Sequence, residues 1–322
     1  MTDVRIQGLK MTLKRQKRSL QWETLPDAAR FQVAALFAIL SAFLYALGNV
    51  ITQVGLRYSS MSSGVLISLI FCFIFVAFYS LFFTSVNDYL DTGVLFFLAA
   101  GIVGPFFGRI FLYLSIKKVG TAIASTIYEV KPLFSVIAAL FFLNEFMSLA
   151  VFSGMFLMMA GTAIVGLEKS GGQINRKWTK KDLLLPIVSG ACYGIAHALR
   201  KGGLNLVPSP IVGVMVQNIG AMVFVPFIVI FGVNRKRNLR IGQKGCILFG
   251  IVGLLQVSAQ WCLFKALEVG KVVVVSPLSS LSTFFVLLLT ALFLRRHEKV
   301  TPKIVLGAVL IAAATLVLTF KT

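Results

Sequence analysis

Long apolar runs alternate with short polar connections along almost all of the chain after residue 30. A hydrocarbon core of about 30 Å is crossed by roughly 20 mostly apolar residues in a helix. The runs are continuously apolar rather than alternating, which favours helices over the strands of a membrane barrel. The pattern therefore predicts an all-α polytopic membrane protein with ten transmembrane helices, at residues 31–55, 63–84, 93–115, 120–143, 147–167, 183–203, 209–232, 244–266, 271–294 and 303–320.

The composition agrees with a chain that lies in a bilayer. Of the 322 residues, 58% are hydrophobic and only 13% are charged, whereas a soluble protein carries about 25% charged residues. This excludes an ordinary soluble enzyme and a disordered chain. The net charge of +20 would suggest nucleic acid in a soluble protein, but here it concerns topology. We expect a multi-pass protein of a bacterial cytoplasmic membrane, with no nucleic-acid partner.

The two halves of the chain share short matches in the same order, which indicates an internal duplication. Residues 39–56 align without a gap with residues 187–204, so that Tyr45 meets Tyr193. Each half has five predicted helices, an odd number, so the second half enters the membrane in the opposite orientation. Secondary carriers built in this way bind substrate near the midplane, between the halves. We expect four segments: a basic tail at 1–30, repeats at 31–167 and 183–320, and a polar linker at 168–182.

The fourth predicted helix contains Pro132 and leads into Phe-Leu-Asn-Glu, which ends at Glu145. With ten helices in two sets of five, the chain resembles the drug/metabolite transporter superfamily, in particular its EamA-domain branch. In that family each half typically has a helix that runs through a Pro into an apolar stretch ending in Leu-x-Glu. The second half departs from this pattern, since Ser282 stands where the Pro would align and Pro277 lies five residues earlier. The resemblance implies transport of a small molecule and leaves the substrate open.

Ionisable side chains at membrane depth are costly, which makes each of them a candidate for a function. Glu129 and Lys131 lie in the fourth predicted helix. Residues two apart on a helix point to different sides, so we expect no ion pair between these two. Two roles for Glu129 stay open: proton exchange in each transport cycle, and a structural ion pair with Arg109 or another basic residue. Pro132 and Pro277 are expected to kink their helices.

Polar side chains recur at i, i+4 and i+8 in the first and sixth predicted helices, which places each set on one helix face. The two stripes are Ser41, Tyr45 and Asn49, and Ser189, Tyr193 and His197. We expect them to face each other and to line a substrate cavity. The alternative is interhelical hydrogen bonding, worth about 0.6 kcal/mol per contact. Other candidate substrate-binding residues share a position inside a predicted helix: Arg109, Glu129, Lys131, Arg200, Gln256, Gln260, Ser279 and Ser282.

Basic residues outnumber acidic ones at membrane depth, with Arg109, Lys131 and Arg200 against Glu129. This excess favours a substrate that carries a carboxylate or a phosphate. The preferred function is secondary active transport of a small polar metabolite by alternating access. Export is one of the two directions that stay open. The rivals are an integral-membrane enzyme acting on lipid and a non-transporting scaffold or sensor. No catalytic motif or cofactor motif is recognisable.

Helix packing accounts for the remaining motifs. Gly104-x-x-x-Gly108 and Gly190-x-x-x-Gly194 are expected to let helices approach closely within the monomer. The cysteines form no Cys-x-x-Cys pair and the two histidines are far apart in sequence, so neither a metal site nor a disulfide is supported. All four cysteines lie in or at the ends of predicted helices: Cys72, Cys192, Cys246 and Cys262.

The charges of the loops and of the N-terminal tail predict opposite orientations. Seventeen Lys and Arg residues follow the odd-numbered helices when Lys244 and Lys303, the first residues of the next spans, are included. Two residues at span ends, Lys201 and Lys271, are counted after the even-numbered helices. By the positive-inside rule, the odd loops are cytoplasmic and both termini lie outside. The tail, with seven basic residues, and the family resemblance both favour cytoplasmic termini. The tail is also a candidate for contact with anionic lipid. Orientation and oligomeric state stay open at this point.

Overall fold

The structure is a computed structural model, and the elements formed by its described residues are all helices. The basic tail up to residue 25, residues 171–178 of the linker and parts of the fourth and seventh predicted spans lie outside the described residues. The all-α prediction is confirmed for the rest. The described residues are 26–55, 57–59, 61–84, 86–119, 124, 127–170, 179–223, 242–293 and 302–320.

The helices follow the apolar runs closely, because hydrophobic segments of this length satisfy their backbone groups internally. The first half contains α2 (Asp27–Gly55), α3 (Met61–Phe83), the short η1 (Val86–Tyr89), α4 (Gly93–Gly101), the π-helical η2 (Ile102–Gly108), α5 (Arg109–Val119), α7 (Lys131–Phe142) and α8 (Leu149–Ser170). The second half contains η3 (Lys180–Leu183), α9 (Leu184–Leu206), α10 (Pro210–Val223), α12 (Gln243–Val269), α13 (Val272–Ser279), α14 (Leu281–Phe293) and α15 (Pro302–Phe320).

Among the described helices, five are long and apolar enough to cross a membrane on their own. The shorter apolar helices are 131–142, 149–164, 210–222 and 272–286. The five long segments are Ala28–Thr52, Leu66–Phe83, Gly93–Leu112, Lys181–Leu206 and Gln243–Val269. The chain is thus an all-α membrane protein with several membrane-spanning helices.

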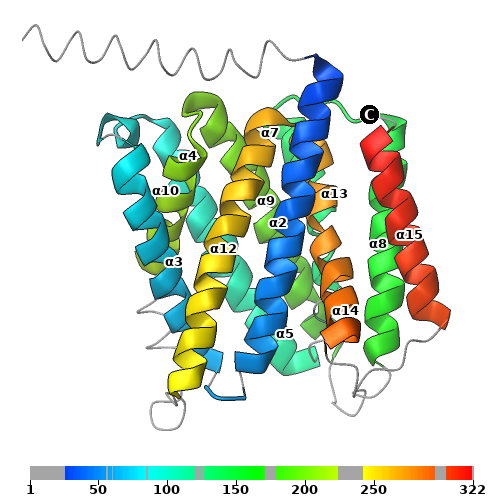
Figure 1. The fold of residues 1–322 in the computed structure, drawn as a ribbon. Coiled ribbons are helices and arrows are strands. Elements are labelled where there is room, and N and C mark those ends of the chain that lie inside the picture. Colours follow the sequence, from blue (N-terminus) through cyan, green and yellow to red (C-terminus); the bar gives the residue numbers. More distant parts are fainter. Residues whose placement is uncertain are drawn as a thin grey trace, which may run out of the picture.

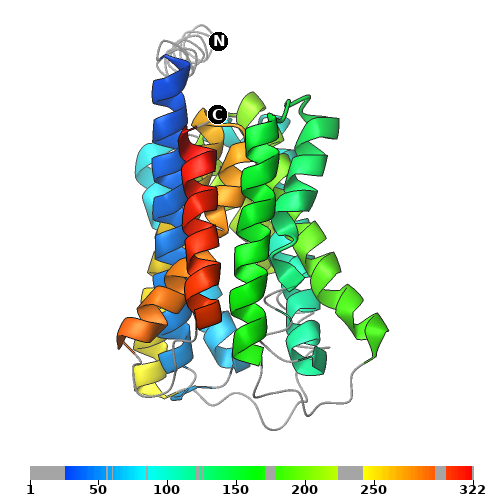
Figure 2. The same ribbon diagram turned by 90° about the vertical axis from the view of Figure 1, so that its right-hand side faces the viewer.

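Corresponding helices of the two halves run in opposite directions. In Figure 1, α2 runs from the upper to the lower end of the bundle, whereas α9 runs from the lower to the upper end. Figure 2 shows the last helices of the halves, α8 and α15, side by side and also antiparallel. The start of α2 and the end of α15 lie at the same end of the bundle.

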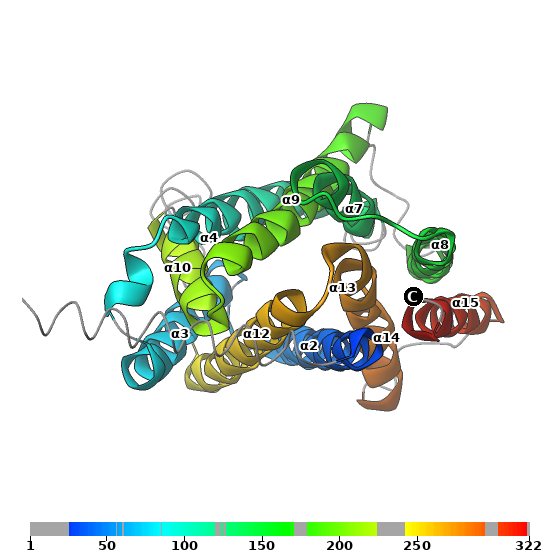
Figure 3. The same ribbon diagram turned by 90° about the horizontal axis from the view of Figure 1, so that it is seen from above.

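The halves are interleaved rather than stacked as separate bodies. The first helix of the first half, α2, packs on α12 and α14 of the second half. The first helix of the second half, α9, packs on α7, α4 and η2 of the first half. Seen from above, α8 and α15 pair at one edge of the bundle (Figure 3). Residues on α2 and α9 therefore face helices of the opposite half.

The two Gly-x-x-x-Gly motifs mediate close packing within the chain, as predicted. A Cβ atom on Gly104 would lie 2.8 Å from the Cβ of Ala196 on α9. A Cβ atom on Gly194 would lie 2.6 Å from the carbonyl oxygen of Lys131, at the start of α7. Glycine at these positions lets α9 approach both η2 and α7.

The fourth and ninth predicted spans are broken near their middles. The first break is a turn at Glu129 and Val130, after which α7 begins at Lys131. The second break lies at Ser280, between α13 and α14. The two breaks are about 150 residues apart, which is the separation of the repeat. Pro132 lies in the first turn of α7, where a missing N–H costs nothing, so the expectation of a kink within a continuous helix is wrong at this residue.

Candidate functional site

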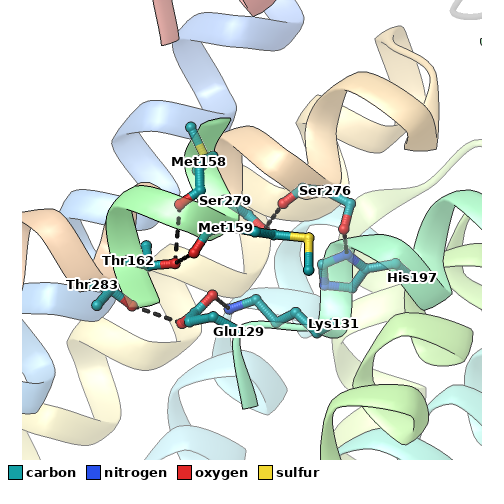
Figure 4. Close-up of polar contacts among 9 residues, drawn as sticks. All are labelled: Glu129, Lys131, Met158, Met159, Thr162, His197, Ser276, Ser279 and Thr283. Carbon is teal, nitrogen blue, oxygen red and sulfur yellow. Dashed lines mark hydrogen bonds and ion pairs between the residues drawn. The ribbon is translucent and has the colours of Figure 1, made fainter. Parts of the chain in front are cut away.

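Glu129 links the broken helices of the two halves. Its side chain is at a helix break and the residue is only 6% exposed. Its Oε1 atom accepts a hydrogen bond of 2.6 Å from Thr283 Oγ1, in the first turn of α14. Its Oε2 atom lies 3.4 Å from Lys131 Nζ (Figure 4). One carboxylate therefore contacts both breaks.

The expectation that Glu129 and Lys131 do not pair is wrong. The argument from helix geometry fails because Glu129 lies in a turn before α7 rather than on a continuous helix. The Lys131 ammonium, on a residue that is 8% exposed, also lies 5.0 Å from the ring centroid of Tyr128. Glu129 therefore forms a structural ion pair, and its partner is Lys131.

His197 on α9 connects this region to α13. The residue is buried, and its Nδ1 atom lies 3.2 Å from Ser276 Oγ (Figure 4). Ser279 Oγ donates to the carbonyl oxygen of Ser276, one turn earlier in α13. Tyr193, one turn before His197, packs edge-on against Tyr128 with ring centroids 5.4 Å apart. The stripe predicted on α9 therefore meets α13 and the segment before α7.

Arg200 continues the same face of α9. The residue is only 4% exposed, and its Nε atom donates a hydrogen bond to Gln217 Oε1 on α10. Its guanidinium carbon lies 5.9 Å from the ring centroid of Phe264. Three tyrosines lie within range of electrostatic interaction with Arg200: Tyr45, Tyr128 and Tyr193.

Side-chain amides form a chain behind Arg200. Gln217 Nε2 donates to Gln260 Oε1 at 3.1 Å, and Asn218 Nδ2 donates to the same oxygen at 2.9 Å. Cys72 on α3 donates to Asn218 Oδ1 at 3.5 Å. Of these residues only Gln260 is among the predicted substrate-binding set. The signal for Gln217 and Asn218 is their place as adjacent amides in the otherwise apolar α10.

The serines of the two stripes join helices rather than line a site. Ser41 Oγ donates to the carbonyl oxygen of Ala259 on α12 at 2.8 Å. Ser189 Oγ donates to the carbonyl oxygen of Gly108 at 2.7 Å. Both serines are fully buried. For these two residues, the alternative of interhelical hydrogen bonding holds.

Three of the predicted site residues lie outside these contacts. Asn49 is exposed, and Gln256 and Ser282 are half-buried. Within the described part of the chain, these three make no side-chain hydrogen bond to another predicted site residue. Arg109, the first residue of α5, is half-buried and interacts electrostatically with Tyr45.

Glu145 caps a helix of the opposite half, a role that the sequence did not reveal. Its Oε1 and Oε2 atoms accept hydrogen bonds from the backbone N–H groups of Val272 (3.0 Å) and Val273 (3.1 Å), at the start of α13. On the other side of the same turn, Lys201 Nζ donates to the carbonyl oxygen of Leu267 at 2.7 Å. The sequence marks Glu145 as the last residue of Phe-Leu-Asn-Glu. It does not show that the partner of Glu145 is the start of α13.

The polar groups of the site are of the kinds that bind polar solutes. The described residues contain no group of His, Cys, Asp and Glu that could hold a metal ion. The four cysteines are free thiols. Together, the two halves contribute buried cations, hydroxyls and amides to the region of Glu129, His197 and Arg200.

Comparison with known proteins gives the same architecture. The model of the EamA-like transporter family matches the chain twice, at residues 32–167 and 180–320. No curated protein sequence matches the chain significantly. Among solved structures, a crystal structure described only as that of a protein superposes with a TM-score of 0.72 at 15% identity, covering 88% of this chain and 95% of the other.

Proposed function

The chain belongs to the EamA-like transporter family, and from this premise we propose that it is a secondary active transporter which moves a small polar metabolite by alternating access. Membership makes it an integral, multi-pass membrane protein whose role is membrane transport. The observation that carries the finer proposal is a set of buried polar contacts: Thr283 with Glu129, which joins the two halves, and His197 with Ser276 and Arg200 with Gln217, both within the second half. Polar groups at membrane depth are retained where they serve a pathway.

The proposed architecture is ten spans in two inverted repeats, residues 31–167 and 183–320, joined by the linker 168–182. The opposite directions of α2 and α9 support the inversion. Broken helices near the midplane are the usual place for substrate in such carriers, and here the breaks lie at Glu129 and Ser280. Rocking of one half against the other would expose this region to each side of the membrane in turn.

Glu129 is the proposed site of proton coupling. It is buried, and its charged and polar neighbours are Lys131, Thr283 and the Tyr128 hydroxyl. Protonation of Glu129 removes the negative charge that holds Lys131 and weakens the contact between the two breaks. A proton taken up on one side of the membrane thereby changes both the charge of the site and the link between the halves.

We assign substrate binding to the tyrosines of the two stripes and to three basic residues: Tyr45, Tyr193, Lys131, His197 and Arg200. The excess of cations among them favours an anionic substrate. Ser41 and Ser189 are assigned to helix packing. Asn49, Arg109, Gln256, Gln260, Ser279 and Ser282 are assigned to the edge of the site or to its support.

A proteoliposome experiment tests the coupling. A metabolite that raises the Tm of the purified protein is identified first, since ligands stabilise by mass action. Uptake of that metabolite is then measured with and without a pH gradient. Glu129→Gln is expected to abolish the response to the gradient while exchange of metabolite across the membrane continues. Glu268→Gln serves as the control, because it makes the same change at a carboxylate that pairs with Lys265 within α12. An unchanged pH response in Glu129→Gln contradicts the assignment.

A further inference from the structure

We propose that Arg200 binds an oxyanion of the substrate, a carboxylate or a phosphate, and that Gln217 orients Arg200 for this without neutralising its charge. The inference rests on the proposed function and names the substrate class of the same site. It assigns different roles to the two buried cations, Lys131 and Arg200.

The charges of the site are balanced at Lys131 and unbalanced at Arg200. Lys131 lies 3.4 Å from the Glu129 carboxylate. Within the described residues, Arg200 contacts a neutral amide and an aromatic ring, and no carboxylate lies within ion-pair distance of it. A buried charge without a counter-charge is costly in a membrane. An anion bound at Arg200 would remove this cost.

In the part of the chain that the structure describes, the guanidinium uses one of its N–H donors. It has five N–H groups in a planar fork, and the hydrogen bond to Gln217 takes the one on Nε. Nη2 lies opposite Gly104 of η2, only 3.6 Å from where a Cβ atom of that residue would lie. At this point η2 and α9 approach closely, and Ala196 of α9 lies beside Gly104 as well. The Nη groups make no hydrogen bond among the described contacts, and they suit the two oxygens of a carboxylate or a phosphate.

Tyrosines from both halves lie within electrostatic range of the same guanidinium. Tyr45 belongs to α2, Tyr128 to the segment before α7, and Tyr193 to α9, and each interacts electrostatically with Arg200. An oxyanion on Arg200 would therefore have hydroxyl donors from the first and the second half near it. Such a ligand would connect the halves, as a transported substrate must.

The amide network explains why residue 217 is Gln and not Glu. Gln217 Nε2 donates to Gln260 Oε1, which fixes the direction of the amide, so Gln217 Oε1 must face Arg200. Asn218 donates to the same Gln260 oxygen and holds it in place. Gln217 is thus a positioning residue that orients the guanidinium, while a Glu of the same shape would neutralise it.

The substitution Gln217→Glu makes this testable with little change in shape. The readout is the shift in Tm of purified protein, at fixed KCl concentration, with matched probes: lactate against lactamide, and glycerol 3-phosphate against glycerol. We expect one or both oxyanions to raise the Tm of the wild-type protein and their uncharged partners not to. A Tm shift with lactate indicates a carboxylate site, and a Tm shift with glycerol 3-phosphate indicates a phosphate site. Gln217→Glu should abolish the shift, and Arg200→Lys should weaken binding about 10- to 100-fold by losing the fork geometry.

The control is Gln243→Glu, the same change at the exposed start of α12, which should leave the shift intact. Equal shifts with charged and uncharged partners, or an oxyanion shift that survives in Gln217→Glu, overturn the inference. Oxyanion binding that depends on Arg200, in a protein that transports none of the bound probes, overturns the proposed function alone. Transport of a neutral or cationic solute by a protein that binds neither oxyanion overturns the inference alone.

Discussion

Removal of the Glu145 carboxylate should destabilise the contact between the two halves. The carboxylate accepts two hydrogen bonds, from the N–H groups of Val272 and Val273, at 3.0 and 3.1 Å. Loss of a helix N-cap costs about 1 kcal/mol, and loss of a negative charge at a partly buried helix N-terminus costs up to about 2 kcal/mol. We therefore expect Glu145→Ala to lower stability by about 2–3 kcal/mol.

Glu145→Gln separates the charge from the hydrogen bond. The amide keeps one acceptor oxygen but turns an NH₂ group toward the second N–H, so we expect a loss of about 1–2 kcal/mol. Thermal unfolding of the purified protein in detergent should show a fall in Tm of several degrees for Ala and a smaller fall for Gln.

Ser148→Ala is the matched control for this cap. Ser148 Oγ accepts a hydrogen bond from Val151 N at 3.3 Å, within the start of α8. This substitution removes a cap in the same loop without touching the other half, and it should cost less than Glu145→Ala. A Tm for Glu145→Ala equal to that of the wild-type protein, or above that of Ser148→Ala, would refute the reasoning.

Three further predictions concern packing and backbone geometry. Asn144 has a φ of 50°, so Asn144→Ala should cost about 1–2 kcal/mol while Asn144→Gly is tolerated, as thermal unfolding would show; equal Tm values for the two variants contradict this. Ser41→Ala and Ser189→Ala should each cost about 0.6 kcal/mol, add up in the double variant, and leave the ligand-induced Tm shift unchanged; a lost shift would instead place them in the site. Gly194→Ala would bring a Cβ to 2.6 Å from a carbonyl oxygen and should lower stability by about 1–3 kcal/mol. Gly48→Ala, whose Cβ would have its nearest neighbour at 3.9 Å, should be neutral. A lower Tm for Gly48→Ala than for Gly194→Ala would contradict this packing.

The positions of the helices could be predicted from the sequence because hydropathy is a local property. The expected span at 244–266 is α12 (Gln243–Val269), and the span at 303–320 is α15 (Pro302–Phe320). The breaks at Glu129 and Ser280 were not located, although Pro132 and Pro277 mark their neighbourhood. Hydropathy does not show where an apolar stretch is broken. On a continuous helix, Glu129 and Lys131 would point to different sides, and this assumption fails at the break.

The site could be predicted as a set of polar residues but not as a set of contacts. His197 and Arg200 were found because polar groups in an apolar helix need partners. Their partners were not found, since Ser276 lies 79 residues from His197 along the chain and depends on how α9 packs against α13. Glu145 and Val272 are separated by 127 residues. Such contacts follow from the tertiary arrangement, which a single sequence does not specify residue by residue.

Counterflow in proteoliposomes tests the central claim most directly. Vesicles loaded with an excess of the oxyanion that raises the Tm most, chosen from lactate and glycerol 3-phosphate, are diluted into a trace of the same compound carrying a radiolabel. A transporter working by alternating access predicts a transient accumulation of label in vesicles with the wild-type protein and none with Gln217→Glu. Label in wild-type vesicles that never exceeds the level in protein-free vesicles would contradict the account.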